Sequence, residues 1–517
     1  MSMPRPVCRR NYVDAPVCDA SIVIKKAPHE FFYSEFTSFV RRFNQEAMLV
    51  AVTQRALSLP RNFGIDNRGD SALRATPPWA LAAVAKAAIV HGNAHRRAVP
   101  RERDLVTARH MHNTLVAPEL DVPALNSAFA ILARLAFEQF PYYERGLPEL
   151  ARPVAFFDDH SGRKSLEVIS KESMRELVGA DMVTAAGIVL MLATGAEIND
   201  GYFNPGWLDQ INFAELLAEL PREEILAVVN SLFAWDMDQF RREDAEASVR
   251  TPLPHLDRYA FNPLTSRPFV RLSDGRLIAP IPQLIPRRLT PLELYYAGIK
   301  RWGTAFTRDL GELLEDYVGR QFQTLPDATV HSEVVYMQKR QELKSIDWFV
   351  VFDDLVVLIE AKATRSPLAA RAADVSARKA YTQTLGDAFK QLGRTLGILN
   401  KNAPEFAHIP KDRPVIGIVA TLDPWYIANS LARDFLPTAS LPTLVASVGD
   451  LEKLVAIGQR RSVSEILTHI TQAGDERQTW DLGAAIHEFG EPTDRNPLLQ
   501  QAFARLPFGH TQPDQAA

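Results

Sequence analysis

The stretch SIDWFVVFDDLVVLIEAK, residues 345–362, contains two apolar runs rich in Val, Ile and Phe on either side of Asp353 and Asp354. Two such runs separated by a pair of turn residues predict a β-hairpin. If the two Asp residues form the loop, Phe352 faces Leu355, and each residue before Phe352 pairs with one after Leu355.

This register decides which charged side chains meet. It places Asp347 directly opposite Glu360, and Ser345 opposite Lys362. Side chains alternate between the faces of a strand, and facing residues have Cβ atoms about 5 Å apart. We therefore expect Asp347, Glu360 and Lys362 to share one small polar patch on an otherwise apolar sheet.

Two carboxylates this close in apolar surroundings repel each other, so one must be protonated or both must share a cation. Mg²⁺ is bound by one or two carboxylates together with water and substrate phosphates. A lysine beside such a metal is placed to orient a water or to stabilise charge on a phosphate. The pattern predicts metal-assisted phosphodiester hydrolysis, and a structural Asp–Glu–Lys ion-pair cluster is the alternative.

Asp347, twelve intervening residues and Glu360-Ala361-Lys362 resemble the PD-(D/E)XK motif of nucleases with the restriction-endonuclease-like fold. Ile346 stands where that family usually has proline. The resemblance implies an α/β fold with a mixed sheet flanked by helices. It also implies Mg²⁺, with Mn²⁺ as a substitute, bound by Asp347, Glu360 and the Ala361 carbonyl, and a water activated by Lys362. Such nucleases mostly cut DNA, and nothing in the sequence excludes RNA.

Helices are expected on both sides of the hairpin. Residues 304–323 have the apolar spacing of an amphipathic helix, and a strand is expected at 331–338. In the family the first core helix often supplies an acid to the metal, which implies Glu315 as a further ligand and Glu312 as the second choice. Solvated helix charges are the alternative for both.

A long helical region is expected at 369–399, where Gln383, Asp387 and Gln391 share one face. A glutamine after the motif recurs in one branch of the family, which implies Gln391, or else Gln383, as a residue that orients substrate or water. A polar helix face is the alternative. Residues 361–413 contain ten Lys or Arg against four Asp or Glu, a balance that favours phosphate-backbone binding.

The chain has 517 residues, enough for two to four domains. We expect five regions: a flexible N-terminus at 1–28, a mostly α-helical domain of unassigned role at 29–250, a Pro-rich connector at 251–300, the nuclease domain at 301–490, and a disordered tail at 491–517. In the connector, residues 267–279 predict a hairpin with Asp274-Gly275 at its turn. Apolar runs at 414–422 and 442–448 predict two further buried strands.

Composition limits the location and the partners. The net charge of −4 means that nucleic acid can bind only through a local basic patch. Cys8 and Cys18 are the two cysteines and give no disulfide framework, which favours a reducing cytoplasm. The N-terminus lacks the apolar core of a signal peptide. The apolar stretch 185–196 is shorter than the ~20 residues of a membrane span and predicts a buried helix.

Four histidines, His91, His95, His110 and His112, lie close together in the helical region. No acid or cysteine accompanies them at ligand spacing, and arginines crowd them instead. We expect exposed helix histidines there rather than a metal site.

These observations together predict a cytoplasmic, Mg²⁺-dependent endodeoxyribonuclease with DNA as its partner and no membrane. Cutting both strands needs two active sites, so a homodimer is expected, and the helical region is a candidate surface for a protein partner. By analogy, the function would be bacterial defence against phage or foreign DNA, or DNA repair. The alternative is a catalytically silent nuclease-fold module that binds nucleic acid or supports assembly, with the helical half as its interaction platform.

Overall fold

The computed structural model describes residues 27–59, 77–116, 127–139, 142, 147–162, 164–250, 256–338, 340–367, 371–373, 377–401, 403–472, 474, 476–491 and 493–508. Cys8, Cys18 and most of the segment expected to be a flexible N-terminus lie outside these residues. Residues 509–517 of the expected tail also lie outside them.

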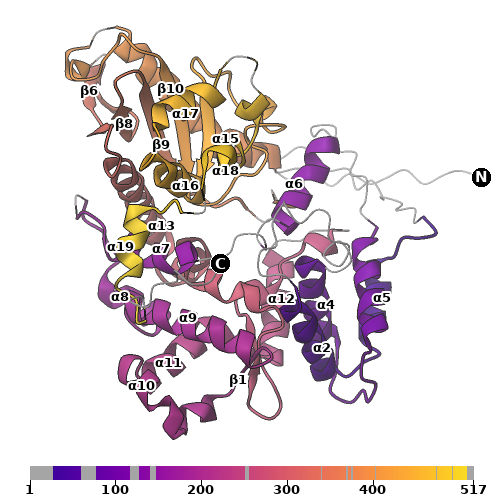
Figure 1. Cartoon of the computed structure of the whole chain (residues 1–517). Helices are drawn as coiled ribbons and strands as arrows, with labels where there is room; N and C mark the ends of the chain where they lie inside the picture. The colour runs from indigo at the N-terminus through magenta and orange to yellow at the C-terminus, as the bar shows by residue number, and fades with distance from the viewer. Residues whose placement is uncertain are drawn as a thin grey trace, which may run out of the picture.

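The N-terminal part of the chain is mostly helical, as its apolar spacing predicted. Figure 1 shows α2, α4 and α5 together at one side and α8 to α11 at the other. The helices are α1 (Tyr33–Val40), α2 (Gln45–Leu57), α4 (Pro78–His91), α5 (Glu102–Asn113), α6 (Ser127–Gln139), α7 (Leu147–Phe157), α8 (Lys171–Val178), α9 (Met182–Ile198), α10 (Ala214–Glu219), α11 (Arg222–Val228) and α12 (Met237–Arg250).

Two stretches of the helical region, residues 33–57 and 171–198, are each divided into two helices. Between α1 and α2, the Asn44 side chain caps α2 by accepting the Ala47 amide at 3.0 Å. Gly179 ends α8 with a φ of 102°, in the left-handed region. A Cβ at Gly179 would lie 2.6 Å from the backbone carbon of Ala227, so only glycine fits there.

By length and composition alone, one helical stretch of the described residues, 171–198, could cross a membrane, and half of its apolar window is buried. The stretch is interrupted at Gly179, however, and Asp181 begins a new helix, α9. Ile188, Val189 and Leu192 of α9 are buried inside the protein. The prediction of a buried helix at 185–196 is therefore confirmed.

The connector contains the predicted hairpin, within a larger sheet. Strands β3 (Phe269–Arg271) and β4 (Leu277–Ile278) pair antiparallel, and Gly275 has a φ of 86° in their turn. β1 (Tyr202–Phe203) and β2 (Ala234–Asp236) extend the sheet to the order β1-β4-β3-β2. Periodicity did not predict β1 and β2, because strands of two and three residues carry no repeating pattern.

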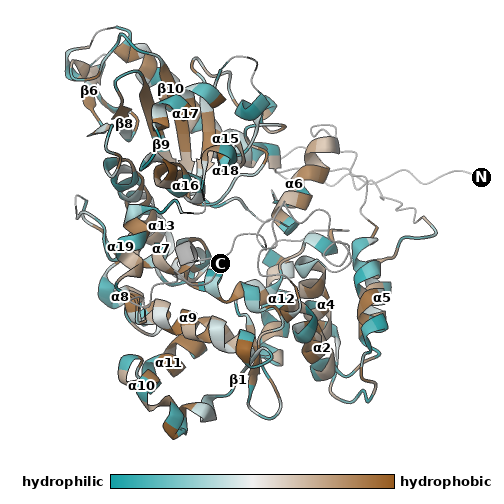
Figure 2. Cartoon of the chain, viewed as in Figure 1, coloured by the Kyte–Doolittle hydropathy of each residue, from teal (hydrophilic) through white to brown (hydrophobic). Residues whose placement is uncertain are grey.

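The C-terminal half contains a five-stranded mixed sheet with the order β11-β10-β9-β8-β5. β10 and β11 run parallel to β9, whereas β8 is antiparallel to β9 and to β5. Figure 2 shows that the central strands of this sheet are largely hydrophobic. The strands are β5 (Thr329–Ser332), β8 (Trp348–Val351), β9 (Val356–Lys362), β10 (Val415–Thr421) and β11 (Thr443–Ser447), and a separate hairpin consists of β6 (Val335–Gln338) and β7 (Gln341–Lys344).

Both buried strands that the apolar runs predicted, β10 and β11, are present. The single strand expected at 331–338 is instead divided between β5 and β6. The C-terminal half is thus a mixed α/β structure preceded by helices, and this coarse part of the expected fold class is confirmed.

Helices cover both faces of this sheet. On one face Ile359 packs in the same cluster as Leu314 of α13 (Pro291–Gln323), and α16 (Val448–Gly458) covers that face too. On the other face Leu358 packs with Leu392 of α15 (Ala377–Leu399). The alternation of neighbouring residues between two cores explains why β9 is apolar from Val356 to Ile359. The remaining helices are α17 (Val463–Ile470), α18 (Leu482–Ala485) and α19 (Pro497–Phe503).

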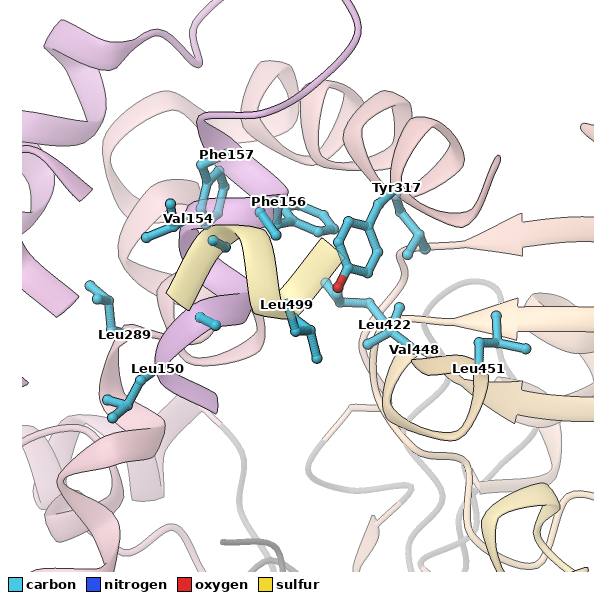
Figure 3. Packing of buried hydrophobic residues seen from close by; sticks show 14 of the residues in the cluster. Leu150, Val154, Phe156, Phe157, Leu289, Tyr317, Leu422, Val448, Leu451 and Leu499 are labelled. Atoms are coloured by element: carbon cyan, nitrogen blue, oxygen red, sulfur yellow. The ribbon is translucent and has the colours of Figure 1, made fainter. Parts of the chain in front are cut away.

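The helical region and the C-terminal sheet share one hydrophobic core (Figure 3). The rings of Phe156 in α7 and Tyr317 in α13 have centroids 5.4 Å apart. Helix α19 packs against α7, and Leu499 and Leu506 are buried in the same core. Residues 493–508 are therefore ordered, and the prediction of a disordered tail was wrong for them. The Pro and Gln content of the segment concealed its short apolar pattern.

Candidate active site

The hairpin has the predicted register. Trp348 pairs with Ile359, and Val351 pairs with Val356. The Phe352 amide donates a hydrogen bond of 2.9 Å to the Leu355 carbonyl, which closes the exposed two-Asp turn. One further step in this register brings Asp347, just before β8, level with Glu360 of β9.

Three of the predicted site residues gather at this end of the hairpin. Asp347 Oδ2 accepts the Ala361 amide at 2.7 Å, and Lys362 Nζ lies 2.6 Å from Glu360 Oε1. The Glu360 side chain is almost fully buried, and among the described residues its Oε2 atom has no hydrogen-bond partner. One buried carboxylate oxygen is therefore left for a further ligand.

The two carboxylates strongly oppose each other's ionisation. Burial and the nearby Glu360 charge raise the pKa of Asp347 well above its usual range. Burial also raises the pKa of Glu360, and the charge and hydrogen bond of Lys362 offset part of this effect. Without a second cation, the site cannot easily keep both acids charged.

The backbone of Ala361 contributes to the same site. In an extended strand the N–H and C=O of one residue project to the same edge. Because the Ala361 amide points at Asp347, its carbonyl lies on the Asp347 side of β9. The Lys362 carbonyl faces the other way and accepts the Leu422 amide at 3.4 Å.

Helix α13 brings Glu315 near these residues. The Trp348 indole Nε1 donates to the Glu315 carbonyl at 2.8 Å, which fixes α13 against β8. The Glu315 charge raises the pKa of both Asp347 and Glu360, so its carboxylate belongs to the same electrostatic group. Burial raises the pKa of Glu315 itself, and Lys164 offsets part of the shift.

Lys164 is a residue of this group that sequence reasoning missed. Its Nζ lies 2.5 Å from carboxylate oxygens of both Glu312 and Glu315. It comes from the segment between α7 and α8, 151 residues before Glu315 along the chain. No local pattern distinguishes this lysine from a solvated surface residue.

The segment that carries Lys164 is anchored on α13. The Asp309 carboxylate, which is 1% exposed, accepts three successive amides, those of Glu167, Val168 and Ile169, at 2.7–3.0 Å. Hydrogen bonds from several backbone amides to one carboxylate hold the donating segment firmly in place. Lys164 therefore lies on a segment that Asp309 of α13 holds in place.

The two glutamines of α15 differ in their surroundings. Gln391 Nε2 donates to the Ser345 carbonyl at 2.9 Å, two residues before Asp347. Gln383 is exposed on the helix surface. Gln391 therefore ties α15 to the segment just before β8, whereas the structure does not bring Gln383 to the acids.

The basic residues of 361–413 do not all face solvent. Arg365 and Arg371 turn inward, with side chains 9% and 19% exposed, and form ion pairs with Asp423 or Glu293. Arg378 and Arg394 are exposed on α15. The positive charge that a nucleic-acid backbone could reach is therefore smaller than the sequence count indicated.

The site residues suit a hard divalent cation with few protein ligands. Among the described residues no group of three or more His, Cys, Asp or Glu side chains is arranged to hold a metal. Mg²⁺, however, commonly takes one or two carboxylates and completes its shell with water and substrate. The unpartnered Glu360 Oε2, the Asp347 carboxylate and the Ala361 carbonyl edge fit that requirement.

The predicted exposure of the four histidines was wrong for His112, and His91 is half-buried. His112 is 2% exposed, and burial lowers its pKa to about 3. His95 and His110 are exposed, as expected. In the structure the His112 ring contacts the Phe36 ring. Phe36 is distant in the sequence, so the residues around His112 did not predict its burial.

Comparisons of this sequence with protein-family models and with curated proteins gave no match.

Proposed function

We propose that this protein is a metal-dependent nuclease with the restriction-endonuclease-like fold, and that it hydrolyses phosphodiester bonds of DNA. The observation that carries the proposal is the pair of buried acids, Asp347 and Glu360, fixed on adjacent strands beside Lys362. Their mutual repulsion is the arrangement that a bound cation would relieve.

Each residue of the site has a role in this proposal. Asp347, Glu360 and the Ala361 carbonyl bind Mg²⁺, and Glu315 joins them when Lys164 releases it. The metal, when bound, lowers the pKa of a water and offsets charge on the phosphate. Lys362 would orient a water for attack on phosphorus. A bond forms between the water oxygen and phosphorus as one P–O bond of the diester breaks; the attacking water gives a proton to solvent, and the leaving oxygen takes one up. The Lys362 ammonium stabilises the charge that develops on the phosphate. Gln391 donates a hydrogen bond to the Ser345 carbonyl, two residues before Asp347, and so positions Asp347 indirectly.

The wider context is also part of the proposal. Exposed arginines of α15 supply contacts to the DNA backbone, whose affinity would fall with salt. Two copies of the chain would cut the two strands of a duplex. The setting is the cytoplasm, in defence against phage or foreign DNA, with the helical region as the surface for a protein partner.

The test is a cleavage assay on plasmid, linear duplex, single-stranded DNA and RNA with Mg²⁺ or Mn²⁺. The wild type is compared with Asp347→Ala, Glu360→Ala and a matched control, Asp354→Asn. The control removes a carboxylate from the same hairpin at its exposed turn. Metal-dependent cleavage that is lost in the first two variants and kept in the control supports the proposal.

Absence of cleavage on every substrate, with a folded protein that binds no Mg²⁺ at Asp347, would contradict the proposal. Binding of nucleic acid without cleavage would favour the catalytically silent module. Metal binding is measured separately by calorimetry, so that a failure of binding and a failure of chemistry can be distinguished.

A further inference from the structure

Four exposed arginines of the helical region form a positively charged surface apart from the Asp347 site. Arg41 and Arg42 directly follow α1, and Arg96 and Arg97 lie in the loop between α4 and α5. We call these four residues the arginine patch. Figure 1 shows α4 and α5 on the opposite side of the molecule from β8 and β9, the strands of the acid pair. The patch therefore does not belong to the candidate active site.

Backbone hydrogen bonds at Asn44 bring the two pairs of arginines together. The Asn44 side-chain Nδ2 donates to the Arg96 carbonyl at 3.1 Å, although the two residues are 52 positions apart. The Asn44 amide donates to the Ala98 carbonyl at 2.8 Å. Burial lowers the pKa of His91 at the end of α4, and the charge of Arg41 adds to that shift. The end of α1 and the loop after α4 thus lie side by side.

Carboxylates do not balance the positive charge of the patch. Residues 36–44 contain no Asp or Glu, and residues 91–113 contain five arginines against two acids. Among the described residues, none of the four patch arginines forms an ion pair. Glu46, the acid that follows the first pair along the chain, accepts the amide and the hydroxyl of Ser273 instead. A cluster of like charges without counter-charges attracts an anionic partner.

The chemistry of the patch favours a phosphate backbone as that partner. Its cations are all arginines, whose planar guanidinium groups bind phosphate oxygens through paired hydrogen bonds. The guanidinium carbon of Arg42 lies 5.3 Å from the ring centroid of Phe39, so an aromatic ring adjoins the charges. Segments that bind anionic membranes also carry Trp, Phe or Leu for insertion, whereas the exposed apolar residue of this loop is Val99.

We propose that the arginine patch binds the phosphate backbone of a nucleic acid without reading its base sequence. The patch gives the helical region a role in binding, and it supplies the local positive surface that a chain of net charge −4 needs. That the bound strand is also the substrate of the Asp347 site rests on the proposed nuclease function. DNA and RNA present the same backbone charge, and the experiment distinguishes them.

The experiment measures binding of the full chain in EDTA to a short DNA duplex and to the RNA duplex of the same sequence. Fluorescence anisotropy is recorded over a range of salt concentrations. The variants are Arg41→Gln/Arg42→Gln and Arg96→Gln/Arg97→Gln, and thermal unfolding verifies that they fold. Because the assay contains no metal and no cleavage step, its result does not depend on whether the nuclease proposal holds.

The matched control is Arg175→Gln/Arg222→Gln. It removes the same two charges from exposed positions of the helical region. There, each arginine already forms an ion pair, Arg175 with Glu224 and Arg222 with Asp209. An effect of net charge alone would therefore appear equally in the control. Vesicles that contain phosphatidylserine are the probe for an anionic membrane.

We expect each patch variant to weaken duplex binding about 10-fold, and the control to leave it nearly unchanged. The slope of log affinity against log salt should decrease by about 2 in each patch variant, because each lost phosphate contact removes about 0.9 from it. A duplex of unrelated sequence should respond equally. The tighter of the DNA and RNA complexes identifies the source of the backbone.

Three outcomes would overturn the proposal. The first is duplex binding that neither patch variant weakens more than the control does. The second is a loss of binding confined to one base sequence. The third is binding to the anionic vesicles that depends on the patch while duplex binding does not, which would assign the patch to a membrane surface.

Discussion

The carboxylate of Asp347 and the amide of Ala361 join the two strands of the hairpin at 2.7 Å, directly beside Glu360. One acid is therefore held by the backbone that carries the other. Repulsion between two fixed carboxylates raises the free energy of the empty site, and a bound cation would reduce that repulsion.

Asp347→Asn keeps an oxygen that can accept the Ala361 amide and removes the charge. In the absence of metal, we expect its melting temperature to rise by about 1 °C, the shift that corresponds to roughly 1 kcal/mol in a chain of this size. Metal-dependent cleavage should be lost at the same time. Thermal unfolding and the cleavage assay check the two effects, and a variant that cleaves at the wild-type rate would show that Asp347 is not a ligand.

Lys362→Ala removes the ammonium group that lies 2.6 Å from Glu360. We expect cleavage to fall by roughly 10²-fold or more, since the group acts where charge develops. Metal affinity should not decrease, because the variant frees Glu360 from its ion pair. Single-turnover rates and calorimetry with Mg²⁺ test this, and an unchanged rate would contradict the role assigned to Lys362.

Lys164→Gln should lower the Mg²⁺ concentration that gives half-maximal cleavage, because Lys164 and the metal compete for Glu315. Arg308→Gln is the matched control, since Arg308 pairs with Glu167 on the same segment without touching Glu315. An equal shift in both variants would mean that only the attachment of the segment matters. If Lys164→Gln leaves the required Mg²⁺ concentration unchanged, Glu315 is not a metal ligand.

Asp481 should make stability depend on pH near neutrality. Burial and the Asp450 charge raise the pKa of Asp481 to about 7. In the unfolded chain this carboxyl loses its proton near pH 4, so between about pH 4 and 7 the folded state binds more protons and stability falls as the pH rises. Asp481→Asn should remove this dependence and stabilise the protein at pH 8 by about 4 kcal/mol at most. Melting temperatures at pH 4.5 and 8 provide the test, and a variant no more stable than the wild type at pH 8 would contradict it.

Leu506→Ala should destabilise the whole protein, because Leu506 is 1% exposed in the core shared by both halves. Truncations of this kind typically cost about 2–5 kcal/mol. Gln501→Ala, on the exposed side of the same segment, should change little. Thermal unfolding followed by signals from both halves gives the measurement. Unfolding of the C-terminal segment alone, without the rest, would contradict a shared core.

The sequence predicted the hairpin and its register because both depend on local features. A two-residue turn between β-branched runs fixes which residues face each other, and so Asp347 and Glu360 could be placed together. Gln391 was correctly placed near the hairpin, but its contact with the Ser345 backbone could not be inferred from helical spacing.

Other parts depended on distant segments. Lys164 reaches Glu315 only because Asp309 binds the backbone at 167–169, a contact with no local signal. The inward turn of Arg365 similarly depends on Glu293, which precedes it by 72 residues. Charge counts over a window could not separate such buried cations from exposed ones.

The packing of α19 on α7 has a consequence for biosynthesis. Arg505 and Asp159, which form an ion pair across this contact, are 346 positions apart. At about 5–20 residues per second, the ribosome needs roughly 20–70 s to cover that distance. The apolar face of α7 stays uncovered on the nascent chain for that time, which makes it a target for chaperones that bind growing chains. An incomplete chain that stops before α19 would keep this face open, and quality control would then recognise it as unfinished.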